Sequence, residues 1–431
     1  MKSAVMVAFD RAAIVAHQTQ MIQKMLEALL DSNAFYGAKL RAAGIHRSSL
    51  TLDEFSSCVP FTFKTELVAD QLKHPPYGSN LTYPLHRYTR FNQTSGTTGR
   101  PMRWLDTPES WEAMLDCWVR VFESAGVCSA DRVFFPFSFG PFLGFWVAFE
   151  AATRMGCLVI PGGGMRSSAR LQTILDNEVT VLCSTPTYAV RLAEVAAEEK
   201  LDLSASKVRS IIVAGEPGGS IPATRSLIER LWPGARVVDH HGMTEMGPVS
   251  YECPQRPGVL HIIEAAYFPE VIDRQTLKPV PPGETGELVL TNLNRVGSPL
   301  LRYRTGDLVK RAAGLRCACG SCELALEGGI LARTDDMVVV RGVNLYPSAV
   351  EEVIRSVGGI AEFQVEVSTE RALAELSVQI EPVPGEEPGT AIADRVAAAL
   401  QRAFALRASV SCVPPGSLPR FEAKARRWIR R

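Results

Sequence analysis

The chain has 431 residues, 46% of them hydrophobic, and its 46 Lys and Arg balance its 46 Asp and Glu, so the formal net charge is zero. This length suits two or three domains with substantial cores. The balanced charge offers no attraction to nucleic acid or to an anionic membrane, so neither is expected as a partner.

The N-terminal region is predicted to be helical, because apolar residues recur at helical spacing over residues 12–40. Asp10 and Arg11 interrupt the short apolar stretch that precedes it, which is atypical of a signal peptide. The longest apolar run, residues 133–149, contains two prolines and does not suit a membrane span. We therefore expect a cytoplasmic protein.

Strands and helices alternate through the middle of the chain. An irregular stretch at residues 61–88 comes first, and a polar glycine loop and a helix at residues 110–125 follow it. Predicted strands then cover residues 133–137, 157–160, 179–184, 211–214 and 236–239. Helices are predicted between them at residues 142–155, 168–177, 188–199 and 221–231. This alternation predicts an α/β fold with a doubly wound sheet.

The last third of the chain has a different pattern. Strands at residues 287–291 and 308–311 predict a β-rich subdomain. Alternating strands at residues 363–367 and 376–380, with a one-sided apolar helix after them, predict a small α+β domain that starts near Asp335. We therefore expect a large domain of residues 1–334 and a small C-terminal domain of residues 335–431.

Hydroxyl side chains and glycines cluster between Thr94 and Gly99. The backbone of such a loop can wrap around a phosphate chain. The Gly-Lys-Ser/Thr ending of a P-loop is absent, and a flexible surface turn explains the composition about equally well. Both interpretations stay open on composition alone.

Two further segments carry groups suited to a nucleotide. Residues 239–245 follow a predicted strand, where open α/β sheets bind ligands, and Thr244 and Glu245 there could hold a phosphate and a metal ion. Asp307, in the turn of residues 303–307, could accept hydrogen bonds from two ribose hydroxyls. A satisfied strand-end turn and a turn-capping Asp are the plain structural alternatives.

Charged residues mark the predicted domain boundary and the C-terminal tail. Arg333 and Asp335 precede a β-run between unlike domains, which suggests a hinge, although an ordinary charged loop has the same composition. Lys424 lies in a basic tail at residues 418–427, which taken alone indicates a solvated surface.

In this order and spacing, the five segments resemble the adenylate-forming superfamily of acyl-CoA synthetases, and most of all its phenylacetate–CoA ligase branch. Residues 94–99 match the family's phosphate loop fully, and residues 303–307 and 335–344 match closely. The resemblance spans nearly the whole chain. It implies ATP-dependent activation of a carboxylic acid to an acyl-adenylate and transfer to coenzyme A, with release of AMP and pyrophosphate.

The resemblance also implies a role for each motif. Thr244 contacts the α-phosphate, Glu245 holds Mg²⁺, and Lys424 reaches into the site during adenylation. Asp335 is the hinge about which the small domain turns, and this rotation withdraws the lysine and exposes a pantetheine tunnel beside Gly342. The implied nucleotide contacts are Thr94, Ser95, Gly96, Thr97, Thr98, Gly99, Gly215, Glu216, Pro217, Asp239, His240, His241, Gly242, Asp307 and Arg333.

This chain departs from the family's pattern at several positions. His241 stands where the family usually has a Tyr that packs on adenine, so a second function for His240 and His241 stays open. Arg100 replaces the usual Lys and keeps its charge. Phe421 and Ala423 replace a Ser and a Gly near the lysine, which leaves the geometry of the tail open.

Five residues are candidates for a zinc site. Cys253 and His261 form one pair, and Cys317, Cys319 and Cys322 form a Cys-x-Cys-x2-Cys group. Thiolates and an imidazole suit tetrahedral zinc, and a closed site with four ligands would be structural. Relatives in the resembled branch carry a similar set. We favour Cys253, His261, Cys317 and Cys319, with Cys322 spare; unrelated thiols are the alternative.

Aromatic residues crowd the segment 134–142, which lines the acid pocket in the resembled family. Aromatic walls favour a flat apolar acid such as a benzoate or an arylacetate. His240 or Arg166 could serve a ring substituent or the carboxylate. The predicted pocket residues are Phe139, Gly140, Phe142, Ala214 and Met243.

The acceptor and the assembly are less defined by the sequence. Coenzyme A is the first expectation, and a carrier-protein thiol or an amine is the alternative. A non-catalytic relative is a third reading, against which the intact Glu245, Asp307 and Lys424 argue. A homodimer is one assembly that the sequence leaves open.

Overall fold

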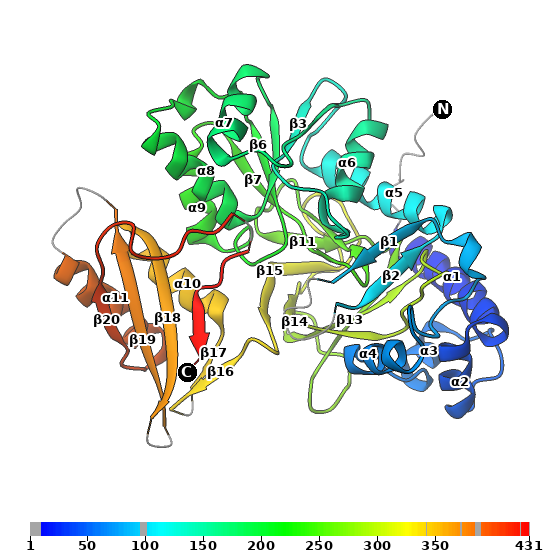
Figure 1. The fold of residues 1–431 in the computed structure, drawn as a ribbon. Coiled ribbons are helices and arrows are strands. Elements are labelled where there is room, and N and C mark those ends of the chain that lie inside the picture. Colours follow the sequence, from blue (N-terminus) through cyan, green and yellow to red (C-terminus); the bar gives the residue numbers. More distant parts are fainter. Residues whose placement is uncertain are drawn as a thin grey trace.

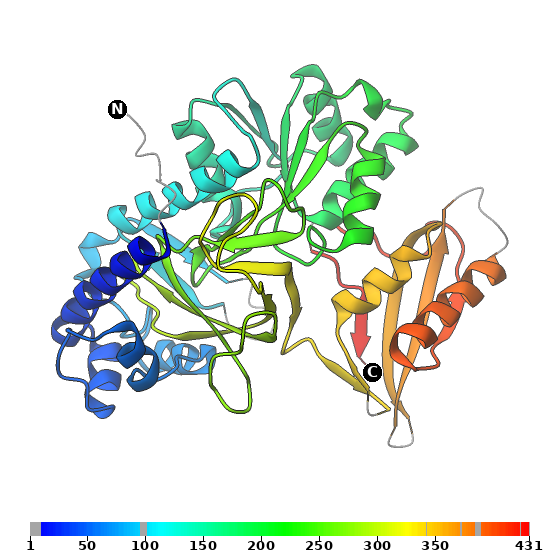
Figure 2. The same cartoon turned by 180° about the vertical axis from the view of Figure 1, so that it is seen from behind.

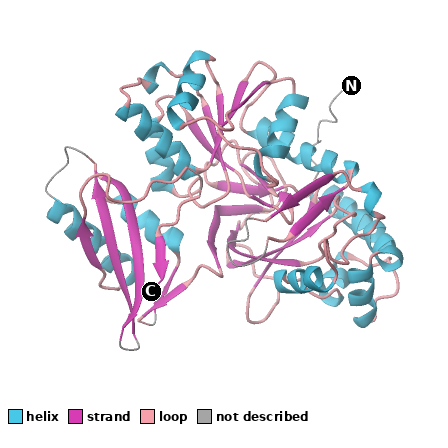
Figure 3. Ribbon diagram, viewed as in Figure 1, coloured by secondary structure: helices cyan, strands magenta, loops and turns pink. Residues whose placement is uncertain are grey.

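The computed structural model describes residues 10–94, 101–341, 343–370, 373–383, 389–422 and 424–430. Ser95 to Gly99 of the predicted phosphate loop, together with Arg100, Gly342 and Ala423, lie outside the described residues. Helices surround the sheets of the large region, and the C-terminal part forms a separate sheet with helices beside it (Figure 3). Within the described ranges, every helix is too short or too polar to cross a membrane.

A five-stranded parallel sheet in the order β4-β3-β5-β6-β7 lies among α6 to α9 in the upper part of Figure 1. Its strands are β3 (Arg132–Phe135), β4 (Leu158–Pro161), β5 (Val181–Ser184), β6 (Ser210–Val213) and β7 (Arg236–Asp239). β4 lies on one side of β3 and β5 on the other, so the winding direction reverses between β3 and β5. Ligands bind at such a reversal, outside the carboxyl ends of the strands.

Helices cover both faces of this sheet, as expected for parallel strands. One face packs against α5 (Pro108–Ser124) and α6 (Gly144–Arg154), and the other against α7 (Ser167–Asp176), α8 (Pro186–Glu198) and α9 (Pro222–Leu231). α5 and α8 each start with a capping Thr followed by Pro, a favourable pair for a helix N-terminus. The predicted doubly wound fold is confirmed.

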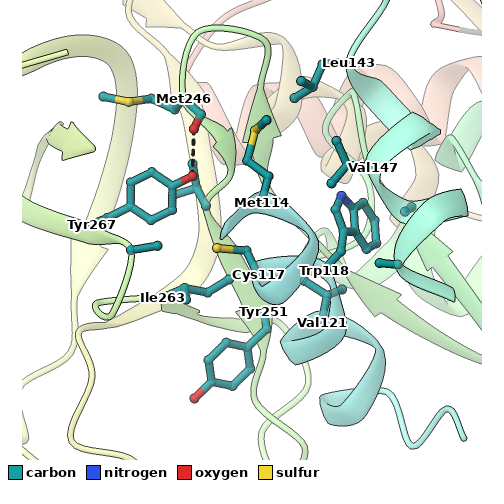
Figure 4. Packing of buried hydrophobic residues seen from close by; sticks show 14 of the residues in the cluster. Met114, Cys117, Trp118, Val121, Leu143, Val147, Met246, Tyr251, Ile263 and Tyr267 are labelled. Atoms are coloured by element: carbon teal, nitrogen blue, oxygen red, sulfur yellow. Dashed lines mark hydrogen bonds between the residues drawn. The ribbon is translucent and has the colours of Figure 1, made fainter. Parts of the chain in front are cut away.

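A six-stranded antiparallel sheet in the order β10-β11-β15-β14-β13-β12 shares its core with α5 and α6. Figure 4 shows Met114 and Trp118 of α5 packed near Tyr251, Ile263 and Tyr267, whose hydroxyl donates to the Met246 carbonyl at 2.7 Å. The strands are β10 (Ser250–Glu252), β11 (Val259–Ile262), β12 (Tyr267–Ile272), β13 (Thr285–Asn292), β14 (Tyr303–Arg311) and β15 (Ala325–Arg333).

The N-terminal helices differ from the prediction in two ways. Instead of one helix there are α1 (Arg11–Ser32) and α2 (Ala34–Ala42), because Asn33 adopts an extended conformation and caps α2. The stretch predicted to be irregular, residues 61–88, contains α4 (Lys64–Lys73), so that prediction is wrong for residues 64–73. The Phe63 N–H there bonds to the Glu66 carboxylate at 2.9 Å, a helix start without Ser, Thr, Asp or Asn.

The remaining short elements of the large region lie around these layers. They are α3 (Leu52–Cys58), the 3₁₀ turns Leu85–Arg87 and Leu203–Ala205, and the hairpins β1 (Arg90–Gln93) with β2 (Arg103–Asp106) and β8 (Gly242–Met243) with β9 (Gly247–Pro248).

The C-terminal part forms a four-stranded sheet in the order β20-β19-β18-β21, with its own hydrophobic core (Figures 1 and 2). α10 (Pro347–Ser356) and α11 (Gly389–Phe404) pack on one face of it. The strands are β18 (Ile360–Glu370), β19 (Leu373–Pro382), β20 (Ser409–Cys412) and β21 (Trp428–Arg430), and the hairpin β16 (Val338–Val340) with β17 (Val343–Leu345) precedes them. The exact boundary at residue 335 stays a prediction.

Candidate active site

The predicted site segments meet at the carboxyl edge of the parallel sheet. β6 leads into Ala214, Gly215 and Glu216, and β7 leads into the run that starts at His240. β5 leads directly into Thr185, and β3 into the aromatic segment. Because the strands are parallel, all these loops lie on the same side, at the place where the fold predicts a ligand.

Lys424 approaches this edge from the C-terminal segment between β20 and β21. A methyl group built on Gly215 would lie 3.4 Å from Cε of Lys424 and 3.8 Å from Cγ2 of Thr185. Lys424 keeps part of its surface exposed to solvent. The pKa of Lys424 is lowered because the surrounding protein displaces water, and the charges of Glu216 and Glu245 partly oppose this shift.

The tail that carries Lys424 is attached to both parts of the molecule. The N–H of Ala425 donates to one oxygen of Glu216 at 2.8 Å, and the other oxygen accepts from the Thr187 N–H at 2.9 Å. Two residues further on, the Arg427 guanidinium donates to both oxygens of Glu362 on β18, at 2.6 and 3.1 Å. Glu216, predicted as a nucleotide contact, thus uses its carboxylate to hold the tail.

Asp307 is buried at the centre of a charged group. Arg333, its partner in the β14–β15 register, donates to Oδ1 at 2.9 Å, and Nε2 of His241 lies 3.2 Å from Oδ2. Burial alone would raise the pKa of Asp307, but His241 and Arg333 hold it below the usual value. Arg333 also binds Asp335 through two bonds of 2.9 and 3.0 Å.

This geometry bears on the role predicted for His241. Its imidazole covers the Oδ2 atom of Asp307, which makes no hydrogen bond of good geometry to any described residue. In this structure the two predicted nucleotide contacts are therefore neighbours, and the imidazole lies beside the carboxylate that is predicted to bind the ribose.

Glu245 is buried and paired with a lysine that sequence reasoning missed. Nζ of Lys64, the first residue of α4, lies 3.1 Å from its carboxylate. The half-exposed lysine and the buried carboxylate place one charge of each sign beside the predicted phosphate position. No spacing pattern in the sequence pointed to Lys64, because its segment was predicted to be irregular.

A second residue that the sequence analysis did not identify is Arg295, which holds the backbone of the Thr244–Glu245 turn. The guanidinium of Arg295, which is 2% exposed, donates to the backbone carbonyls of Thr244 at 3.1 Å and Glu245 at 2.9 Å. It also donates twice to Asp106, both times at 2.8 Å. This buried ion pair fixes the backbone of the turn whose side chains are predicted to contact phosphate and metal.

The other predicted nucleotide contact of this region faces inward. The carboxylate of Asp239 accepts from the Ser220 hydroxyl and from the His240 N–H. Burial raises the pKa of this carboxyl group, and Ser220 opposes the shift. Asp239 therefore stabilises the end of β7 in this structure, and its contact with a nucleotide stays a prediction.

The predicted acid-pocket residues are partly gathered. The Phe139 ring lies 4.6 Å from the Trp146 ring, and the Trp146 indole donates to the Gly140 carbonyl at 2.9 Å. Ala214 and Met243 are half-buried at the sheet edge. Phe142 is 49% exposed, and its place in the pocket stays a prediction.

The four favoured zinc ligands lie together: His261 is on β11, Cys253 directly follows β10, and Cys317 and Cys319 lie between β14 and β15. Sγ atoms of Cys253, Cys317 and Cys319 and a ring nitrogen of His261 all lie within 4.8 Å of one another. The Cys253–Cys317 sulfurs are 3.7 Å apart, and Cys319 Sγ is 3.5 Å from His261 Nε2. Tetrahedral zinc at normal bond lengths would separate two thiolates by about 3.8 Å, so this cluster fits the ion.

Together the fold and the residues at this edge define a class of protein, the adenylate-forming ligases. Residues 91–294 match the AMP-binding enzyme family, and residues 342–431 match the AMP-binding enzyme C-terminal domain. The chain belongs to this family, in its phenylacetate–coenzyme A ligase branch.

Curated relatives support the branch. The phenylacetate–coenzyme A ligase of Thermus thermophilus is 31% identical over 440 residues, which cover 97% of this chain and 97% of that protein. The phenylacetate–coenzyme A ligase of Pseudomonas putida is 30% identical over 372 residues, or 86% of this chain and 82% of that protein.

Solved structures of 2-hydroxyisobutyryl-CoA ligase match in a way that depends on their state. In the postadenylation state with R3-HIB-AMP, the TM-score is 0.92 at 28% identity, over 98% of this chain and 91% of that chain. In the thioesterification state with 2-HIB-AMP and CoA, the TM-score is 0.74 at 29% identity, with 98% and 91% covered. Of these two states, the structure of this chain is more similar to the postadenylation state.

Proposed function

We propose that this chain activates a carboxylic acid with ATP, forms an acyl-adenylate, and transfers the acyl group to coenzyme A. The observation that carries the proposal is Lys424, held by the Ala425–Glu216 bond over the carboxyl edge of the parallel sheet. A cation at that place can bridge the acid's carboxylate and the α-phosphate, where negative charge builds up in the transition state. The likeness to the postadenylation state supports the same assignment.

In the first half-reaction, an oxygen of the acid attacks the α-phosphorus of ATP. A phosphorus–oxygen bond forms to the acid, and the bond to the leaving pyrophosphate breaks. We assign Lys424 and Thr244 to the α-phosphate and Asp307 to the ribose. Glu245 would hold Mg²⁺, which on binding neutralises phosphate charge, while Lys64 is placed to exchange its pairing with Glu245 for one with the phosphates.

In the second half-reaction, the thiol of coenzyme A attacks the acyl carbonyl, the bond to AMP breaks, and the thiol proton passes to solvent. We propose that the C-terminal part first rotates about Asp335, as the two states of the similar ligase suggest. The rotation must break the Ala425–Glu216 contact, which joins the tail to the large region. Reactions with a carrier-protein thiol or an amine remain the alternatives for this step.

We further propose an aromatic acid as substrate, because aromatic rings surround the end of β3. Phe137 stacks on Phe145 at 4.7 Å, and Phe139 packs against Trp146 and Phe149. We also propose a cytoplasmic location, since none of the ten cysteines, all of which lie in the described part of the chain, forms a disulfide. The homodimer named in the sequence analysis stays a prediction.

ATP–pyrophosphate exchange across aryl and alkyl acids tests this function. We expect exchange with at least one aryl acid, and CoA-dependent release of AMP when coenzyme A is added. A carrier-dependent ligase would exchange pyrophosphate normally but would not consume coenzyme A. No exchange with any acid would contradict the proposal.

We propose structural zinc at Cys253, His261, Cys317 and Cys319, since their ligand atoms fit a tetrahedral site. Metal analysis of the purified protein should give about one zinc per chain. Cys319→Ser should lose the metal and unfold at lower temperature. Cys322→Ser is the matched control and should keep both metal and stability; zinc-free protein of normal stability would refute the site.

A further inference from the structure

His240 is a polar residue set into an aromatic wall beside the predicted acid pocket. Its ring centroid lies 4.4 Å from that of Trp118, which in turn is 5.9 Å from Phe145. Phe145 stacks on Phe137 in the segment predicted to line the pocket. Only 5% of His240 is exposed, so whatever its ring nitrogens bind must lie inside the protein or the pocket.

One of the two ring nitrogens has its partner. Nδ1 lies 2.7 Å from the carbonyl oxygen of Ser250, and a carbonyl can only accept, so Nδ1 carries the hydrogen. Burial lowers the pKa of His240 to about 4, which keeps the ring neutral at physiological pH. In a neutral imidazole with the hydrogen on Nδ1, Nε2 has a free lone pair and can only accept.

Nε2 has no hydrogen-bond partner among the residues that the structure describes. It lies next to Gly242, where an added methyl group would be 3.3 Å from Nε2 and 2.9 Å from the backbone oxygen of Gly247, so the ring keeps its place only beside a glycine. Met243, a predicted pocket residue, follows directly. An acceptor without a protein partner next to a predicted ligand site is available to a donor on the ligand.

Resting on the function proposed above, we propose that Nε2 of His240 determines specificity by accepting a hydrogen bond from the acid, so that the substrate class is an aryl acid bearing a hydroxyl or amino group. The acid's own carboxylate is excluded as the partner, because it is itself an acceptor and would face a bare lone pair. An unsubstituted aromatic acid would leave the acceptor buried and unpaired, which weakens its binding.

Matched acids test the proposal in the pyrophosphate-exchange assay. The panel pairs each hydroxy- or aminobenzoate, substituted at the 2-, 3- or 4-position, with its methoxy or methyl counterpart. For at least one position, the wild-type protein should prefer the donor-bearing acid by about 10- to 100-fold in kcat/KM, the range that one buried hydrogen bond supplies.

Two substitutions at His240 distinguish the role of the acceptor Nε2 from that of the hydrogen bond between Nδ1 and the Ser250 carbonyl. His240→Asn keeps a donor for the Ser250 carbonyl but has nothing in the place of Nε2, so the preference should fall to near one. His240→Gln can put its amide oxygen near the place of Nε2 and should restore part of the preference. A merely structural role would instead lower the rates with both acids of a pair equally.

The outcomes distinguish this inference from the proposed function. Exchange by the wild-type protein without preference for any donor-bearing acid would overturn the inference alone. A preference that survives in His240→Asn would also overturn it. Absence of exchange with every acid would overturn the proposed function and this inference together.

Discussion

Lys424→Ala should slow adenylation at least about 10²-fold and leave thioester formation from a preformed acyl-adenylate near the wild-type rate. The asymmetry follows from the geometry. Lys424 lies over Gly215 at the nucleotide edge only while the tail is held by Glu216. Rotation of the C-terminal part for the second half-reaction would carry the lysine away, so its loss should not affect that step.

The two half-reactions can be measured separately, by pyrophosphate exchange and by single turnover of purified acyl-adenylate with coenzyme A. Arg426→Ala is the matched control, because it removes a positive charge from an exposed position two residues away. It should leave both rates within about twofold, as surface charges usually contribute little. Equal losses in both half-reactions of Lys424→Ala would indicate damage to the fold, and normal adenylation would remove Lys424 from its role.

The pH dependence gives a second measure of the same lysine. Adenylation needs the charged ammonium, and the pKa of Lys424 lies below the ordinary lysine value because the site displaces water. The rate should therefore begin to fall at a lower pH than it would with a lysine of ordinary pKa. In Lys424→Arg this alkaline decline should disappear, since a guanidinium stays protonated.

The strands of the parallel sheet could be predicted because each is a short apolar run between helical patterns, whereas their order in the sheet could not. Residues 236–239 were predicted as a strand and form β7, and residues 179–184 contain β5. The strand ends then place the motif loops on one edge, since the carboxyl ends of parallel strands lie together. Positions such as Gly215 and His240 follow from this rule without knowledge of any side-chain contact.

The features of the fold and the site that could not be predicted depend on contacts between residues that are far apart in the sequence. Asp106 and Arg295 are 189 positions apart, and Glu216 and Ala425 are 209 apart. Asn33 ends α1 because its side chain is buried against Asn80 and Thr82. Local periodicity contains no signal for such pairs. The cysteine cluster is different, since the restricted ligand types of zinc narrowed the choice before the fold was known.

Asp106→Leu should reduce the free energy of unfolding by about 3–5 kcal/mol, because it leaves the Arg295 guanidinium buried without its partner. The arginine is 2% exposed and cannot lose its proton to escape the cost. Denaturant unfolding followed by fluorescence measures the loss. Asp116→Leu is the control: its bond to Arg154 is 2.7 Å long but exposed, so the cost should stay below about 1 kcal/mol.

The double variant Asp106→Leu, Arg295→Met separates stability from activity at the same place. Removing both charges ends the desolvation penalty, so much of the lost stability should return. Adenylation should not return, because the carbonyls of Thr244 and Glu245 still lack the donors that fix their turn. If activity recovers along with stability, the pair serves the core alone. If stability falls by the sum of the two single changes, the residues are not coupled, and the buried ion pair is not what holds the turn.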